Sequence, residues 1–171
     1  MGLLKNFRRN NMKMWIIYKN GFGFSRIIAE MIQDRLDDYI NVDVGNAEKV
    51  DPSFVVEEKL DYLIIGDIIS ETLHSAEIQN WVLKYGKISK NINYNLKALS
   101  GFYIAPTDIN DETHWDKFLR ENINAEKFFP PILYLKLNGV KASLDIGAFE
   151  IVKEYSNVFI EFLIKNWVIK K

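Results

Sequence analysis

The chain has 171 residues, a length that suits one compact domain. Hydrophobic residues make up 48% and charged residues 26%, so a packed core is expected and the disordered and collagen-like classes are excluded. The 22 basic and 23 acidic side chains leave a net charge of -1. Such a balance gives no global attraction to polyanions, and we predict no nucleic-acid partner.

The chain contains no cysteine, which excludes disulfides, thiolate metal sites and iron-sulfur clusters. Its 2 histidines stand far apart in the sequence without a metal-ligand companion, so we predict no metal site. No run of residues approaches the roughly 18 apolar residues that a membrane-spanning helix needs. These absences favour a cytoplasmic protein without a membrane span.

The basic and acidic residues divide the chain into two parts. Residues 1–13 carry basic side chains and no acidic one, and we predict a mobile basic extension there. Residues 14–171 contain no linker and no internal repeat. We predict that they form one domain.

Apolar runs typical of strands alternate with helical patterns along this domain. Strands are predicted at residues 15–18, 41–44, 62–65, 98–104 and 132–137. Helices are predicted at residues 25–38, 75–91, 112–122 and 149–169, with Ser25 as the N-cap of the first, and residues 51–59 are predicted to be a short helical or irregular stretch. Such alternation implies right-handed crossovers and a parallel sheet with helices on both faces. Ligands bind these sheets at the carboxyl ends of the strands.

The loop after the first predicted strand, Lys19-Asn20-Gly21-Phe22-Gly23-Phe24-Ser25, leads directly into a helix. Its two glycines permit unusual backbone angles, and free N–H groups at a helix N-terminus attract phosphate. Asn20 and Ser25 could add side-chain hydrogen bonds. One interpretation is therefore an anion site. The other is a tight turn with a serine cap, which needs no ligand.

This loop and its surroundings resemble the flavodoxin signature. Ile16-Ile17-Tyr18, then Gly23, Ser25, Ala29 and Ile32, stand at that signature's spacing without a gap. The resemblance implies an α/β fold of the flavodoxin-like type, a three-layer sandwich with a five-stranded parallel sheet in the order 2-1-3-4-5. It also implies non-covalent binding of flavin mononucleotide (FMN). The layout of short loops is most similar to the flavodoxin-domain group that includes menaquinone-dependent protoporphyrinogen oxidases.

The resemblance also implies which residues would contact FMN. The phosphate would lie on the first loop, and the isoalloxazine ring between the loops after the third and fourth strands. The implied contacts are Asn20, Gly21, Phe22, Gly23, Phe24 and Ser25 for the phosphate, and Asp67, Ile68, Ile69, Ser70, Ala105, Pro106, Thr107 and Asp108 for the ring. The implied activity is electron transfer or that of a small FMN-dependent oxidoreductase, with a redox partner protein or a quinone.

Some residues depart from the family pattern. Asn20 stands where a serine or threonine is usual, and Phe22 and Phe24 replace residues with polar donors. Ser70 stands where a ring-stacking aromatic is usual, and Asp67 beside the ring would repel a flavin anion. A second hypothesis is therefore a flavodoxin-like domain that has lost flavin and serves as an interaction or regulatory module. Trp115 and Tyr103 could stack on the ring, but such aromatics more often belong to the core.

Two further readings concern other parts of the chain. The segment that ends at Asp67 resembles the phosphoacceptor strand of receiver domains, but Tyr18, Lys19 and Asn20 stand where such a domain needs an acidic pair for magnesium. A receiver is therefore not favoured. The last predicted helix has more apolar surface than a small sheet covers, which a homodimer or contact with a membrane surface would explain.

Overall fold

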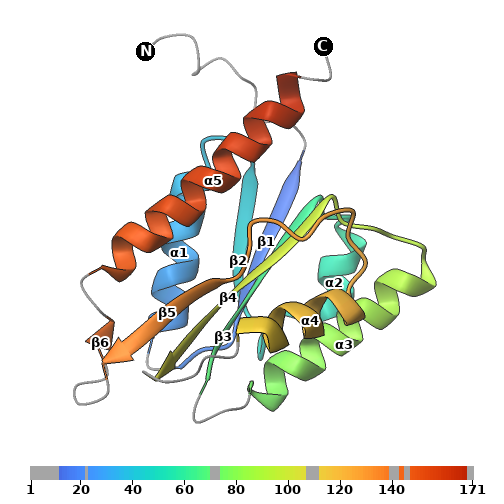
Figure 1. The fold of residues 1–171 in the computed structure, drawn as a ribbon. Helices are drawn as coiled ribbons and strands as arrows, with labels where there is room; N and C mark the ends of the chain where they lie inside the picture. Colours follow the sequence, from blue (N-terminus) through green and yellow to red (C-terminus); the bar gives the residue numbers. More distant parts are fainter. Residues whose placement is uncertain are drawn as a thin grey trace.

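The computed structural model describes residues 12–21, 23–69, 74–106, 112–138, 143–144 and 147–168. A single six-stranded sheet has the order β2-β1-β3-β4-β5-β6 and lies between two layers of helices (Figure 1). The strands are β1 (Lys13–Tyr18), β2 (Asn41–Asn46), β3 (Tyr62–Ile68), β4 (Ala98–Pro106), β5 (Leu133–Asn138) and β6 (Ser143–Leu144). The helices are α1 (Phe24–Leu36), α2 (Pro52–Glu57), α3 (Ala76–Asn91), α4 (Glu112–Asn122) and α5 (Ala148–Val168). Strands β1 to β5 pair in parallel, so the predicted fold class and strand order are confirmed.

The central strand β1 shows why the apolar runs of the sequence are continuous. Met14, Ile16 and Tyr18 pack on one face of the sheet, in the core beneath α1 and α5. Trp15 and Ile17 pack on the other face, in the core beneath α2, α3 and α4. Successive side chains of a strand point to opposite faces, so a strand covered on both sides must be apolar throughout. Within the described residues, no helix is long and apolar enough to cross a bilayer.

The edges of the sheet differ from the prediction. Strand β6, which the sequence did not predict, pairs antiparallel with the end of β5 through Leu144 and Ser143. Before β5, residues 124–129 run parallel to the start of β4, with bridges from Leu96 to Ala125 and from Leu99 to Phe128. Two residues are too few to show a period, so β6 leaves no mark in the sequence, and residues 124–129 pair with β4 only through isolated bridges. Strand β2 forms the other edge.

The prediction that Ser25 caps the first helix is wrong. The N-cap of α1 is Gly23, with φ 80° and ψ -11°, and no side chain caps the helix. Glycine adopts this left-handed conformation without steric cost, so the chain can turn into the helix two residues earlier than a serine cap would allow. Ser25 consequently lies inside the first turn, where it is fully buried.

The N-terminus of α2 carries a pH-sensitive contact. The carboxylate of Asp51 accepts hydrogen bonds from Lys84 Nζ on α3 (2.8 Å) and from the Ser53 N–H (2.7 Å). Hydrogen bonds from Lys84 and Ser53 lower the pKa of Asp51 from 3.8 to about 2. A lowered pKa in the folded state means that the charged carboxylate stabilises the fold above about pH 4, and that this contribution is lost as the pH falls towards 2.

We therefore expect Asp51→Asn to lower the urea midpoint at pH 7 and to leave it unchanged near pH 2. Asparagine is also a good N-cap, so the substitution removes the charge and retains the cap. Urea denaturation followed by circular dichroism at both pH values tests this. A difference between the two proteins that persists at pH 2 would contradict the assignment.

Candidate cofactor site

The N-terminus of α1 forms an open cradle at the carboxyl end of β1. Apart from the chain neighbours of Gly23, no described residue lies within 4 Å of a Cβ atom built on it, so the described part of the fold leaves space over the turn. The Phe24 N–H donates to Gly21 O (3.2 Å) and the Ile27 N–H donates to Gly23 O (3.1 Å). The first N–H groups of a helix have no acceptor within it, and no side chain supplies one here. This geometry suits an anion.

Ser25 provides a second feature of the cradle. Its hydroxyl is buried and has no hydrogen-bond partner among the described residues. Buried hydroxyl groups in folded proteins are nearly always paired, because an unpaired one costs about 1 to 3 kcal/mol. An orphaned hydroxyl in the first turn of α1 therefore fits a phosphate group that is bound at that turn.

The rest of the predicted phosphate loop is partly described. Asn20 is exposed, and Phe22 lies outside the described residues. A Cβ atom on Gly21 would meet Ile68 Cγ2 at 2.2 Å, so the loop after β1 passes directly against the end of β3. The structure thus brings together two of the predicted contact segments, and glycine is required where they meet.

The two described cations next to the cradle in the sequence, Lys19 and Arg26, already have carboxylate partners. Lys19 forms ion pairs with Glu48 and with Glu77 (3.7 Å). The hydrogen bond to Glu48 is the largest cause of a raised pKa at Lys19. Arg26 Nε donates to Glu30 Oε1 (2.7 Å) on the exposed side of α1. An anion in the cradle would therefore be held chiefly by backbone N–H groups, the helix dipole and Ser25.

At the ring end of the predicted site, Asp67 does not present a bare charge. Its side chain is 0% exposed, and its carboxylate accepts hydrogen bonds from within the fold. Ile69 and Ala105 are buried, Ile68 is half-buried, and Pro106 ends β4. The predicted ring contacts Ser70, Thr107 and Asp108 lie outside the described residues.

The aromatic candidates for ring stacking belong to the core. Trp115 and Tyr103 are both 0% exposed, and Trp115 Nε1 donates to Ile65 O (3.3 Å). Trp115 also stacks on His74, with ring centroids 4.0 Å apart. The side chain of His74 is only 13% exposed and lies against these aromatic residues.

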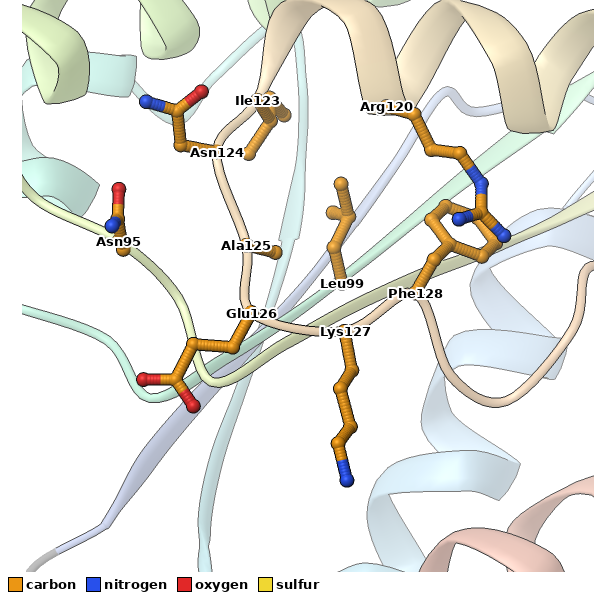
Figure 2. A pocket seen from close by; sticks show the side chains of 9 residues that line it. All are labelled: Asn95, Leu99, Arg120, Ile123, Asn124, Ala125, Glu126, Lys127 and Phe128. Carbon is orange, nitrogen blue, oxygen red and sulfur yellow. The ribbon is translucent and has the colours of Figure 1, made fainter.

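A separate hollow of about 380 Å³ lies at the opposite, amino end of the sheet (Figure 2). Arg120 lies over the ring of Phe128, 4.3 Å from its centroid, and Leu99 and Ile123 form an apolar floor. Glu126 and Lys127 give its rim charges of both signs. The hollow is far in the fold from the cradle and contains no predicted contact residue.

The last helix keeps part of its apolar surface uncovered. Phe149, Ile151 and Val158 on α5 are 48%, 46% and 42% exposed. Beside them, a hollow of about 350 Å³ lies between α5 and the approach to β5, with Pro131 and Tyr155 in its lining. Dimerisation through this helix remains a prediction.

Comparison with known proteins identifies the fold. No protein-family model and no curated protein matches the chain. Flavodoxin 2 from Bacillus cereus is 20% identical over 87% of this chain and 98% of its own, with a TM-score of 0.67. The flavodoxin of Streptococcus pneumoniae TIGR4 is 17% identical over 87% and 98%, with a TM-score of 0.61.

A larger protein contains a similar domain. Rubredoxin oxygen:oxidoreductase from Desulfovibrio gigas is 12% identical over 92% of this chain, with a TM-score of 0.69, and the chain spans 37% of its length. At such identities the likeness shows the fold alone. The chain therefore has the flavodoxin-like fold, with β6 added at one edge of the sheet.

Proposed function

We propose that this flavodoxin-like chain binds FMN non-covalently at the carboxyl end of its sheet and exchanges electrons with a redox partner. The observation that carries the proposal is the buried, unpartnered hydroxyl of Ser25 in the open first turn of α1. This turn follows β1 at the point where the strand order of the sheet reverses, which is where ligands bind open α/β sheets.

The residues that would hold the phosphate are Asn20, Gly21, Gly23 and Ser25. Gly21 and Gly23 let the backbone approach the ligand, and Ser25 donates its hydroxyl proton to a phosphate oxygen. The segments that begin at Asp67 and Ala105 would flank the ring. When bound, flavin supplies the redox chemistry, and the protein supplies binding, orientation and electrostatics. The partner would be a redox protein or a quinone.

A second candidate function is an interaction or regulatory module without flavin. The direct packing of Ile68 against Gly21 favours it, because this contact joins the loop after β1 to the end of β3 without a ligand. Under this hypothesis the cradle is a strand-to-helix turn, and the exposed apolar residues of α5 become the candidate interaction surface.

An absorbance scan from about 300 to about 550 nm, followed by titration of the protein with FMN, separates the two candidates. We expect flavin bands in the purified protein, or quenching of FMN fluorescence with a dissociation constant on the order of micromolar. Riboflavin, which lacks the phosphate, should bind more weakly. A colourless protein that leaves FMN fluorescence unchanged would refute flavin binding and favour the interaction module.

Ser25→Ala should have opposite effects on FMN binding and on the stability of the ligand-free protein. Loss of a hydrogen bond to a charged phosphate is expected to weaken FMN binding about tenfold or more, with little change for riboflavin. Removal of an orphaned buried hydroxyl should leave the free energy of unfolding unchanged or raise it by about 1 kcal/mol. Fluorescence titration and urea denaturation measure the two effects.

The matched control is Ser156→Ala. Ser156 is also a buried helical serine, but its hydroxyl donates to Val152 O (2.8 Å) on α5. This variant should leave FMN affinity unchanged and should not gain stability. Equal FMN affinities of the Ser25→Ala and wild-type proteins would remove Ser25 from the phosphate site.

A further inference from the structure

The buried carboxylate of Asp67 lies within hydrogen-bond distance of the His74 ring and of three other donors. Asp67 Oδ2 lies 2.9 Å from Nδ1 of His74 and accepts the Ser75 N–H (3.0 Å). Oδ1 accepts the Ile68 N–H (2.8 Å) and the Ser75 hydroxyl (3.0 Å). The contact of Nδ1 with Oδ2 is a hydrogen bond from His74 to Asp67 in the tautomer that has its proton on Nδ1, because a carboxylate can only accept. All four contacts thus offset the charge of this carboxylate.

The other faces of the His74 ring join two parts of the fold. The ring stacks on Trp115 of α4 at a centroid distance of 4.0 Å and an angle of 20°. Tyr103 of β4 approaches it edge-on at 6.0 Å. His74 therefore connects the end of β3, through Asp67, to Tyr103 of β4 and Trp115 of α4. The segments that begin at the ends of β3 and β4 are the two that would flank a flavin ring.

We propose that His74 is a positioning residue that offsets the charge of Asp67 and thereby sets how tightly the site holds reduced flavin relative to oxidised flavin. The inference rests on the proposed function. Two-electron reduction of flavin at neutral pH adds negative charge to the ring, and a nearby uncompensated carboxylate would repel it. Because Asp67 is fully buried, little water screens this repulsion. The hydrogen-bond donors around the carboxylate must reduce the repulsion instead.

Three variants separate the hydrogen bond of His74 from the stacking of its ring. His74→Asn places an amide N–H near the position of Nδ1 and retains the donor to Asp67 without the ring. His74→Phe retains a ring over Trp115 and removes the donor. His74→Gln places its amide nearer the position of Nε2, so it also removes the donor and serves as a second test if His74→Phe fails to fold.

The experiment measures the dissociation constant of oxidised FMN by fluorescence quenching and the midpoint potential of the bound flavin by reductive titration. His74→Phe and His74→Gln remove the donor. In these variants we expect the ratio of the affinity for reduced FMN to the affinity for oxidised FMN to fall about tenfold. For a two-electron couple this ratio corresponds to a potential about 30 mV more negative. His74→Asn should stay within about threefold of the wild-type ratio.

The outcomes distinguish the inference from the proposed function. A wild-type protein that does not bind FMN overturns the proposed function, and the inference with it. A wild-type protein that binds FMN while the donor-removing variants keep its potential overturns the inference alone. Equal shifts in His74→Asn and His74→Phe also overturn it, because the donor to Asp67 would then not be the cause. Urea denaturation of each ligand-free variant confirms that it is folded.

Discussion

Replacing Gly23 with aspartate is expected to weaken FMN binding by about 100-fold or more. Gly23 has φ 80°, where an L-residue costs roughly 1 to 2 kcal/mol more than glycine. The new carboxylate would also stand in the open space over the turn, where the phosphate would lie. Repulsion between two anions at such close range adds to the strain, because the helix N-terminus can neutralise only one of them well.

Gly23→Asn is the matched control. Asparagine has nearly the size of aspartate, tolerates the left-handed conformation and carries no charge. We expect this variant to lose less than about tenfold in FMN affinity by fluorescence titration. Gly147→Asp provides a second control, because a Cβ atom on Gly147 also meets no described residue within 4 Å other than its chain neighbours, but Gly147 precedes α5. Equal affinities of Gly23→Asp and Gly23→Asn would mean that the phosphate does not occupy this turn.

The second large effect concerns stability and lies at the contact of α3 with α4. In an exposed helix, Gly→Ala stabilises by about 1 kcal/mol. At Gly86 of α3, however, the new Cβ would lie 2.0 Å from the backbone oxygen of Asn122, the last residue of α4. A backbone oxygen cannot move away by a change of rotamer, as a side chain can, so α3 and α4 must move apart. Overpacking of this kind costs about 3 kcal/mol, and we expect a net loss of about 2 kcal/mol.

Urea denaturation of the Gly86→Ala protein measures this loss as a midpoint lowered by about 1 M. Lys87→Ala, at the adjacent exposed position of the same helix, should change stability by less than about 0.5 kcal/mol. A Gly86→Ala protein that is more stable than the wild type would show that helix propensity, and not the contact with Asn122, decides the outcome at this position.

The fold was predictable because its strongest signals are local. Each central strand is an apolar run, such as Tyr62 to Ile65 in β3, and each helix begins near a capping or turn residue, such as Ser75 before α3. Strand β6 carries no such signal, because two residues cannot show a period. The cap of α1 was misplaced because a serine is the usual cap and a left-handed glycine is not visible in a sequence.

The candidate site was predictable only in part. The spacing from Ile16 to Ile32 predicted a turn into a helix at the end of β1, and the structure has that turn at Gly23. That the turn holds a phosphate stays a prediction. The environment of Asp67 was not predictable, because its partner His74 lies seven residues along the chain, outside β3. Such a pairing depends on tertiary packing, here on the stacking of His74 against Trp115, and no local pattern encodes it.

The two edges of the sheet bear on how the protein behaves at high concentration. An open strand edge offers unpaired N–H and C=O groups to a neighbouring molecule, which is a common route to aggregation. At one edge, β6 pairs with the end of β5 and covers its last residues. At the other, β2 carries an exposed Asp43 between two asparagines, Asn41 and Asn46. A charge would have to enter any intermolecular sheet at this edge, so Asp43 disfavours edge-to-edge polymerisation through β2.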